Sequence, residues 1–375
     1  MTAAATTPRR RRILFVAMHR PDRSPSQRFR FEQYLAYIKE HGYDHEFSYL
    51  ISADDDKIFY KPGNLPGKLS IFLRSTFRRL REAMRASAYD IIFIQREAYM
   101  LGTAFFESAF ARSRAKVIFD YDDSIWVNQV SAGNKMLGFL KNADKTRDII
   151  RVSDMVFAGN QYLADFAAQY NPVVRIVPTT IDTDEYQRLP RPANQPEDQV
   201  CIGWSGSFTT IEHFETALPA LRIIHQRYGA RVTFSVVGDG SYRNEELGIV
   251  GLPWRKDTEV ADLSAMDIGI MPLPDTEWAK GKCGLKGLQY MAVETPTIMS
   301  PVGVNTEIIQ HGKNGLLAST TDEWVDALSH LIDDKAARRQ MGRAGRATVV
   351  EHYSVLSERQ HYLDLFEEVL ALPHR

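Results

Sequence analysis

Short apolar runs that alternate with helical patterns are the feature that most restricts how this chain folds. Residues 13–17, 90–95, 116–120, 155–159 and 174–178 each have the length and apolar content of a strand buried on both faces. Helical patterns separate these runs, and strands alternating with helices form parallel sheets with helices on both faces. The first half of the chain is therefore predicted to be an α/β unit, with its first helix ending at Gly42.

The same alternation restarts after a proline-rich segment. Residues 190–196 are polar, contain three prolines and lack apolar periodicity, which is typical of a linker. Strand-like runs then follow at 200–204, 232–237, 268–271 and 297–299, and one helix is expected from about 211 to 228. A chain of 375 residues is long enough for two domains, so we expect two Rossmann-like domains.

Composition narrows the possible functions. The chain is 44% hydrophobic and 25% charged, as is typical of soluble globular proteins, and its net charge of −1 gives no reason to expect nucleic acid as a partner. Cys201 and Cys283 suggest neither a disulfide framework nor a metal cluster, which favours a reduced, cytoplasmic compartment. No run reaches the length of a membrane span, and the arginines at 9–12 precede a strand rather than a signal-peptide core. The first eight residues are expected to be disordered.

The segment 281–296 predicts an anion site at the start of a helix. If the helix begins near Gly284, the amides before it are unpaired and the helix dipole favours an anion there. Lys286 and Gln289 are three residues apart and share a face, while Leu285, Leu288 and Ala292 are expected to mark the packed face. This arrangement suits the diphosphate of a nucleotide sugar. The residues expected to contact that donor are Lys282, Cys283, Gly284, Leu285, Lys286 and Gln289.

An ordered series of short motifs surrounds this helix. They are Asp267-Ile268-Gly269-Ile270-Met271-Pro272-Leu273, Lys286, Tyr290-Met291-Ala292, Pro296, Ser300, Val302-Gly303, Glu307, Gly312 and Asn314-Gly315. In order and spacing the series resembles the donor-binding half of family 4 glycosyltransferases, which are retaining enzymes of the GT-B fold. The resemblance implies two Rossmann-like domains whose parallel sheets face each other across a cleft. It implies an acceptor domain at 1–190, a donor domain at 197–352 and a C-terminal helix at 353–375 that crosses back to the first domain.

Two departures from the family pattern concern the donor site. The family usually has two glutamates separated by seven residues, and here these positions are Gly281 and Gln289. The second glutamate contacts the ribose in the family, and an amide at that position is able both to donate and to accept hydrogen bonds there. Glu294 also stands where the family commonly has glycine.

The resemblance implies an enzyme of the hexosyltransferase type. It would move a sugar with retention from a UDP- or GDP-sugar to an acceptor hydroxyl, in bacterial polysaccharide or lipid-linked glycan synthesis. No cofactor or metal is implied, because helix dipoles and cations such as Lys286 neutralise the leaving diphosphate. Two alternatives remain: a nucleotide-sugar epimerase of the same fold, and an inactive GT-B binding or scaffold protein, which Gly281 and Gln289 favour.

Three further candidates lie near the donor. Gly206 and Ser207 follow a strand in Gly203-Trp204-Ser205-Gly206-Ser207, where amides and hydroxyls are able to hold a phosphate or the transferred sugar; the alternative is an ordinary strand-to-helix turn. Gly238 lies in a Gly-Asp-Gly turn for which the structural interpretation is favoured. Glu307 belongs to the family pattern beside the donor, but an acid at a helix start is an equally good account.

The acceptor candidates lie in the first half of the chain. Asp120-Tyr121-Asp122-Asp123 follows a strand, and three carboxylates so close together repel one another. Asp122 and Asp123 are therefore interpreted first as acceptor contacts, second as a helix-capping cluster and last as metal ligands. Arginines that follow strands suit phosphate recognition, although surface arginines are common. The arginine candidates are Arg28, Arg30 and Arg96.

A basic amphipathic helix is predicted between Leu69 and Arg85. Its apolar stripe is Leu69, Leu73, Phe77, Leu80 and Met84, and Arg74, Arg78, Arg81 and Arg85 run beside it. Such a helix is able to lie on an anionic membrane surface, which would place the protein on the inner face of the membrane near a lipid-linked acceptor. The alternative is a domain helix whose stripe belongs to the core.

Overall fold

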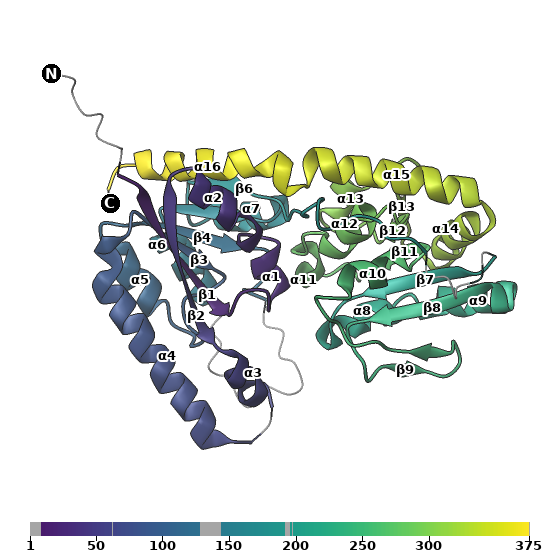
Figure 1. The fold of residues 1–375 in the computed structure, drawn as a ribbon, viewed down its shortest axis with the longest axis horizontal. Coiled ribbons are helices and arrows are strands. Elements are labelled where there is room, and N and C mark those ends of the chain that lie inside the picture. Colours follow the sequence, from purple (N-terminus) through teal and green to yellow (C-terminus); the bar gives the residue numbers. More distant parts are fainter. Residues whose placement is uncertain (1–8, 62, 128–143, 192–195, 197, 375) are drawn as a thin grey trace. The chain divides into compact units, whose positions relative to one another are not determined.

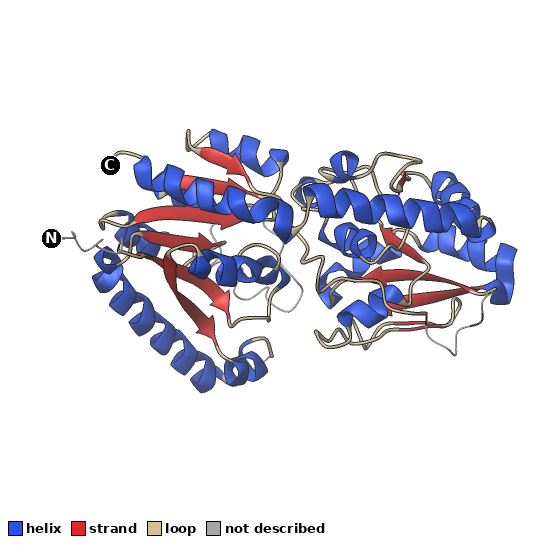
Figure 2. Ribbon diagram, turned by 45° about the horizontal axis from the view of Figure 1, so that its top comes forward, coloured by secondary structure: helices blue, strands red, loops and turns tan. Residues whose placement is uncertain are grey.

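The computed structural model describes residues 9–61, 63–127, 144–191, 196 and 198–374. The disorder expected for residues 1–8 and most of the expected linker, 192–195, lie outside these residues. The chain divides into two compact units, Met1–Val177 with Arg359–Arg375, and Pro178–Glu358. Each unit holds one parallel sheet, and Figure 2 shows helices on both sides of each sheet.

Among the described residues, the first unit contains a six-stranded parallel sheet in the order β2-β1-β3-β4-β5-β6. Its strands are β1 (Arg11–His19), β2 (Tyr43–Ile51), β3 (Ile91–Gln95), β4 (Lys116–Tyr121), β5 (Met155–Ala158) and β6 (Val174–Ile176). All five strands predicted in this half are confirmed. β2 was not among them, because it is an edge strand whose polar residues interrupt the apolar run.

Helices and 3-10 turns connect these strands (Figure 1). They are α1 (Pro25–Arg28), η1 (Glu32–Tyr34), α2 (Leu35–Glu40), α3 (Ala53–Phe59), α4 (Leu65–Arg85), η2 (Ala86–Ala88), α5 (Phe105–Ala111), α6 (Asp144–Val152), α7 (Gln161–Ala168) and α16 (Val355–Ala371). The first predicted helix is divided into η1 and α2, and Gly42, with φ of 97°, follows it as expected.

Aromatic packing joins the C-terminal helix to the core of the first unit. The ring of Tyr362 in α16 stacks on Tyr34 at 4.3 Å between centroids, and the Tyr362 hydroxyl donates a hydrogen bond to the backbone carbonyl of Arg30. This helix buries Tyr362, Leu363 and Phe366. Leu356 in its first turn is exposed, and that turn is assigned to the second unit.

The second unit contains, in the part described, a five-stranded parallel sheet in the order β13-β12-β11-β7-β8. Its strands are β7 (Val200–Ser205), β8 (Val232–Val237), β11 (Ile268–Met271), β12 (Thr297–Met299) and β13 (Leu316–Leu317), and β9 (Arg243–Asn244) and β10 (Ile249–Val250) form a separate antiparallel pair. The four strands predicted here are confirmed. β13 was not predicted because two residues give no periodicity.

The helices and 3-10 turns of the second unit are η4 (Phe208–Thr210), α8 (Ile211–Glu215), α9 (Leu218–Tyr228), η5 (Gly229–Arg231), α10 (Glu259–Ser264), α11 (Glu277–Lys280), α12 (Leu285–Ala292), α13 (Asn305–Ile308), α14 (Thr321–Asp333) and α15 (Lys335–His352). The prediction of a single helix at 211–228 is wrong, because two helices occupy this range. Pro219 stands in the first turn of α9, where its missing N–H costs nothing, so the chain breaks into α8 and α9 just before it.

Sheet order locates a ligand position in each unit. The chain passes from β7 to β8 on one side and then to β11 on the other, so the order reverses between β7 and β11. In the first sheet it reverses between β1 and β3. Ligands of open α/β sheets bind outside the carboxyl ends of the strands at such points. The expected ligand positions are therefore the loops after β7 and β11 in the second unit and those after β1 and β3 in the first.

The apolar stripe of α4 faces solvent, so its interpretation as core is wrong. Leu73 is 59% exposed and Phe77 is 68% exposed, and the other stripe residues are exposed as well. The face that packs inward instead carries Ile71, Ser75 and Arg79. No helix within the described residues is both long and apolar enough to cross a membrane.

Candidate functional site

The start of α12 has the geometry predicted for an anion site. α12 begins at Leu285, and Gly284 before it has φ of 70°, a left-handed conformation that favours glycine. A Cβ at Gly284 would lie 2.3 Å from Cδ1 of Ile308, so no larger residue fits without a shift. The loop is thus held tightly, and its amides precede the first turn of the helix.

Two lysines stand at this helix start, each over an indole ring. Lys286 Nζ lies 5.5 Å from the centroid of the Trp204 ring at the end of β7, and Lys282 Nζ lies 4.5 Å from the Trp278 ring of α11. Trp204 is buried, so the face that its ring presents to Lys286 is fixed by the core. The hydroxyl of Tyr290 accepts a hydrogen bond from Ser205 N at 2.7 Å, which ties α12 to the carboxyl end of β7.

His213 belongs to the same cluster and was not predicted. Burial, followed by the charges of Lys286 and Lys282, lowers the pKa of His213 to about 4. Its Nδ1 is buried and has no hydrogen-bond partner among the described residues. No sequence motif includes this residue, and only its place in the helix after the Gly203–Ser207 loop links it to the donor site.

Stability should fall in acid because of His213. The folded pKa of about 4 lies below the usual 6.5, so the neutral ring stabilises the fold above pH 6.5 and this contribution is lost as pH falls toward 4. At pH 5 the loss should be about 1–2 kcal/mol. Urea unfolding of the wild type and His213→Gln at pH 5 and pH 7.5 measures it. An identical pH response in both proteins would contradict this role for His213.

The loops after β7 and β8 touch through two glycines. Gly206 N donates to Val237 O at 2.9 Å, and Gly238 has φ of 129°. A Cβ at Gly238 would lie 2.0 Å from Gly206 O, so its structural interpretation has a direct cause. The Ser207 hydroxyl is engaged in capping η4 with Thr210, which matches the alternative of a strand-to-helix turn.

Gln289 lies in a buried hydrogen-bond network rather than at an open surface. Its Nε2 donates to Glu259 Oε1 at 2.9 Å, and Glu259 also accepts from the Tyr186 hydroxyl at 2.7 Å and from Trp254 Nε1 at 3.0 Å. Gln289, Glu259 and Tyr186 are all buried. The amide nitrogen is thus committed to a carboxylate, and a glutamate at 289 would face Glu259 directly.

The remaining donor candidates occupy different environments. Cys283 is buried and its Sγ lies 3.7 Å from Gly281 O. Leu288 and Ala292 are fully buried as predicted, whereas Leu285 is half-buried. Glu307 is exposed in the first turn of α13, the place that the helix-start alternative requires. Glu294 has φ of 56°, which explains why glycine suits its position.

In the first unit, one predicted acceptor residue belongs to the core. The Arg30 and Asp120 side chains are both fully buried and form an ion pair, and the Arg30 guanidinium also donates to Val177 O. Burial raises the pKa of Asp120, and Arg30 opposes that shift. Arg30 is thereby committed to holding β4 and the end of β6 together.

Arg96, Asp122 and Asp123 do come together at the reversal point of the first sheet. Arg96 Nε donates to Asp122 Oδ1 at 2.9 Å and its Nη2 lies 3.4 Å from Asp123 Oδ2. Burial alone would raise the pKa of Asp122, but Arg96 and Arg30 outweigh it and hold that pKa below its usual range. The positive charges of Arg30 and Arg96 therefore offset part of the repulsion that is expected among the carboxylates at 120, 122 and 123.

The same edge carries a histidine that was not predicted. His19 ends β1, and its Nε2 lies 2.5 Å from the Tyr60 hydroxyl. Burial and then Arg23 lower the pKa of His19 to about 4, so the ring is neutral at pH 7.

The two other arginine candidates are partly or wholly buried at this end of the sheet. Arg96 follows β3 with φ of 61°, a strained conformation for a non-glycine residue. Arg28 is 6% exposed, with its guanidinium over the Phe29 ring.

Among the described residues, no three His, Cys, Asp or Glu side chains are grouped so that they would hold a metal ion. Asp122 and Asp123 accordingly have an arginine as their neighbour rather than further ligands. The charged and polar groups gathered near the two reversal points are Lys282, Lys286 and His213 in the second unit, and Arg96, Asp122, Asp123 and His19 in the first.

Comparisons with known proteins bear on the family and the fold of this chain. Residues 199–334 match the family model described as Glycosyl transferases group 1. The chain is 32% identical over 117 residues to N-acetyl-alpha-D-glucosaminyl L-malate synthase of Bacillus anthracis, covering 31% of this chain and 30% of that protein. It is 37% identical over 82 residues to D-inositol 3-phosphate glycosyltransferase of Pseudarthrobacter chlorophenolicus, covering 21% and 18%. The chain thus matches less than a third of the length of these curated relatives.

Solved structures resemble nearly the whole chain. A glycosyltransferase from Rickettsia africae has a TM-score of 0.67 at 13% identity, covering 97% of this chain and all of that one. Alr3699/HepE of Anabaena, solved in complex with UDP-glucose, has a TM-score of 0.65 at 13% identity, covering 95% and 99%. The predicted fold class is confirmed: this is an α/β chain of the GT-B fold.

Proposed function

We propose that this GT-B chain is a retaining glycosyltransferase of family 4 that takes its sugar from a UDP- or GDP-sugar. The observation that carries the proposal is the convergence of Lys282, Lys286 and the start of α12 at the reversal point of the second sheet. Cations and helix amides together favour a diphosphate. UDP is the first nucleoside diphosphate to test, because a structural neighbour was solved with UDP-glucose.

In this proposal the donor lies along the loops of the second unit. The diphosphate binds at Lys286, Lys282 and the amides around Cys283 and Gly284. The loop of Gly206 and Ser207 borders it, and Gly238 allows the close contact that holds this loop. Gln289 contacts the ribose. Because its Nε2 is held by Glu259, it does so through Oε1, which accepts a hydrogen bond from a ribose hydroxyl. This restriction accounts for an amide at a position where the family usually has a carboxylate.

Catalysis in the proposal depends on stabilising the leaving group. As the bond from the anomeric carbon to the diphosphate breaks, negative charge develops on the diphosphate oxygens beside Lys286. The acceptor hydroxyl attacks on the same face and its proton passes to the departing diphosphate, so the configuration is retained. Fixed cations and amides need no reorganisation as that charge appears, which makes electrostatic preorganisation the main source of rate.

The acceptor in the proposal is bound by the first unit. Arg96, Asp122 and His19 lie at the carboxyl ends of β1, β3 and β4, where polar side chains are able to orient a hydroxyl or a phosphate-bearing acceptor. Asp122 stays ionised because Arg96 and Arg30 lower its pKa, so it is a hydrogen-bond acceptor at neutral pH. Asp123 and Arg28 support this edge from buried positions.

The exposed face of α4 supports peripheral attachment to an anionic membrane. The helix is 21 residues long, its stripe of leucines, Phe77 and Met84 is exposed, and cations flank the stripe. Large apolar side chains rarely line one face of a surface helix unless something covers them. Arg81 and Arg85 are exposed beside it and complement anionic headgroups. A lipid-linked acceptor would be reached from this position.

Placing two acidic residues in the stripe should abolish vesicle binding without unfolding the protein. Leu73→Glu/Phe77→Glu is expected to weaken binding to vesicles that contain phosphatidylglycerol by at least about tenfold, since each side chain loses its insertion energy. Co-sedimentation measures it, with Val350→Glu/Leu356→Glu, two exposed apolar positions elsewhere, as control. Failure of the wild type to bind vesicles, or loss of self-association in the variant instead, would contradict membrane attachment.

Product analysis tests the proposed activity. The protein is incubated with UDP-glucose, UDP-N-acetylglucosamine and the GDP-sugars, with and without an acceptor mixture that includes lipid-linked glycans. Release of the nucleoside diphosphate together with an α-glycoside from an α-donor supports a retaining transferase. A second nucleotide sugar formed from donor alone indicates the epimerase. Donor binding without any product favours the scaffold alternative.

A further inference from the structure

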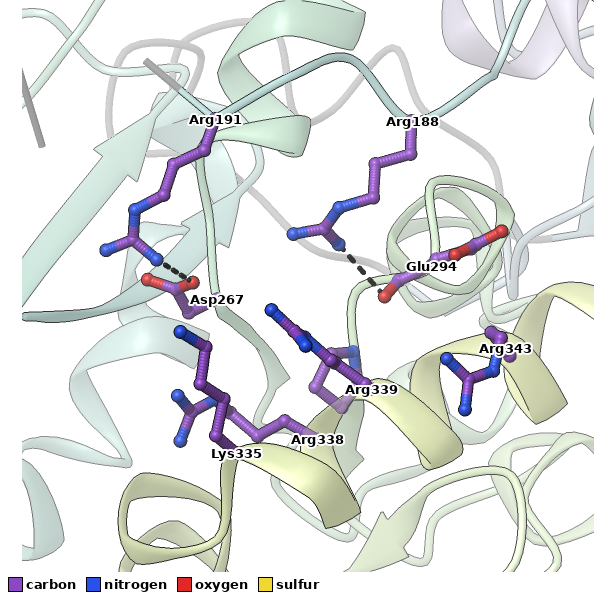
Figure 3. A pocket seen from close by; sticks show the side chains of 9 residues that line it. Arg188, Arg191, Asp267, Glu294, Lys335, Arg338, Arg339 and Arg343 are labelled. Atoms are coloured by element: carbon purple, nitrogen blue, oxygen red, sulfur yellow. Dashed lines mark hydrogen bonds and ion pairs between the residues drawn. The ribbon is translucent and has the colours of Figure 1, made fainter. Parts of the chain in front are cut away.

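A strongly basic pocket lies at the amino-terminal ends of strands β11 and β12 in the second sheet. Its volume is about 500 Å³, and it lies beside Asp267 and Pro296, the residues just before β11 and β12. The donor candidates follow the carboxyl ends of these strands, so the pocket lies at the opposite end of the same sheet. Six cationic side chains line it (Figure 3): Arg188, Arg191, Lys335, Arg338, Arg339 and Arg343.

The two carboxylates of the pocket do not balance these cations. Asp267 already accepts from Arg191 Nη1 at 2.8 Å and from Cys201 N at 2.9 Å. Glu294 supplies its backbone carbonyl to Arg188 at 3.0 Å. Burial lowers the pKa of Arg338, Asp267 opposes that shift, and Arg191 lowers the pKa again, which shows how closely the charges of this pocket act on one another.

Three cations of the pocket have fixed structural contacts. Arg188 donates to the carbonyls of Val293 and Glu294, which directly follow α12. Arg338 donates to Ile332 O at 2.9 Å at the end of α14. Arg191 holds Asp267 and the carbonyl of Gln199. These contacts anchor the guanidinium groups while leaving their charge in the pocket, so the positive potential is built into the fold rather than spread over mobile surface residues.

The other three cations form a row on α15. Lys335, Arg339 and Arg343 are four residues apart and share one helix face, and all are exposed. In Figure 3, Lys335 and Arg339 extend toward the side on which Arg191 and Arg188 lie. Neither Arg339 nor Arg343 forms an ion pair or a side-chain hydrogen bond with a residue in the described ranges. Their charge is therefore available to a ligand.

We propose that this pocket is a second ligand site, which binds a small free anion bearing two or more phosphate groups. Guanidinium groups arranged around a concave surface bind phosphate oxygens in bidentate fashion. The described residues that line the pocket are all charged apart from Pro296, and none is aromatic, so no ring is present on which a nucleobase would stack. A bound polyphosphate would join α15 to the segment that carries Arg188 and Arg191, stabilising both.

Titration of the full-length protein with tripolyphosphate at 150 mM NaCl, followed by isothermal calorimetry, tests this site. Lys286→Ala should keep the binding that belongs to this pocket, because Lys286 does not line it, and should lose only the binding of tripolyphosphate at the start of α12. Arg339→Gln/Arg343→Gln should bind at least about tenfold more weakly. The control Arg112→Gln/Arg114→Gln removes the same charge from exposed positions in the first unit.

Loss of affinity in Arg339→Gln/Arg343→Gln and not in the control supports the proposal. Equal affinity in that variant and the control, or loss of all binding in Lys286→Ala, would overturn it, because the anion would then be bound by general charge or at the donor site. Absence of wild-type binding would also overturn it. Since no lipid is present, binding under these conditions shows that the pocket takes up a free anion without a membrane.

Discussion

Replacing Lys286 by alanine should lower the rate of sugar transfer by at least about a hundredfold. Lys286 is the cation that the first turn of α12 holds beside the proposed leaving group, over the buried face of Trp204. Its removal leaves developing diphosphate charge to amides and to Lys282 alone. The effect should fall mainly on kcat, because the charge that Lys286 meets is greatest in the transition state. Steady-state kinetics with the identified donor and acceptor measures it.

A matched control separates charge from folding in this experiment. Lys313→Ala removes a lysine from the same unit whose amine, within the described residues, donates only to the exposed side chain of Gln310. We expect unchanged kinetics for Lys313→Ala and similar urea midpoints for both variants. Turnover of Lys286→Ala close to that of the wild type would show that the leaving group departs elsewhere.

Gln289→Glu should destabilise the protein at pH 7 by about 3 kcal/mol. The substitution restores the residue usual in the family, but it sets a carboxylate against Glu259, whose Oε1 lies 2.9 Å from the present amide nitrogen. Two buried carboxylates at this distance do not both ionise, so one pKa rises above the unfolded value of about 4.3. The penalty is therefore small below about pH 4.3 and grows as pH rises toward 7.

The compensating double variant tests whether Glu259 is the cause. Glu259→Gln/Gln289→Glu removes the repulsion and should recover at least about half of the lost free energy of unfolding. Urea unfolding at pH 5 and pH 7 of the wild type, both single variants and the double variant gives the coupling energy. A pH-independent loss in Gln289→Glu, or additive single effects, would mean that packing and not charge repulsion dictates glutamine at this position.

The fold was predictable because the centres of buried parallel strands are short apolar runs. β1, β3, β4, β7 and β11 all contain such a run, and α12 begins at Leu285, beside the start predicted near Gly284. β2 was not predictable in the same way, since polar residues interrupt the apolar run of this edge strand. The break between α8 and α9 depends on Pro219, whose tolerated place is the first turn of a helix rather than its middle.

The candidate sites were less predictable because they depend on contacts between distant residues. Lys286 was identified from local spacing, but His213 reaches it only through the fold, 73 residues earlier in the chain. Arg30 and Arg96 look alike in sequence, yet one is buried against Asp120 and the other stays half-exposed beside Asp122. The partner of Gln289 is Glu259, which no motif singles out. Burial and pairing across the sheet decide these roles.

The measurement that tests the central claim most directly is the thermal unfolding of the wild type and Lys286→Ala with UDP, GDP, ADP and their sugars. A ligand at a hundred times its dissociation constant adds roughly 2.7 kcal/mol to the free energy of unfolding. We predict that the nucleotides of one base, with uridine nucleotides tested first, stabilise the wild type. Lys286→Ala should lose most of this stabilisation. No response to any nucleotide, or an equal response in both proteins, would contradict a nucleotide-sugar site at the start of α12.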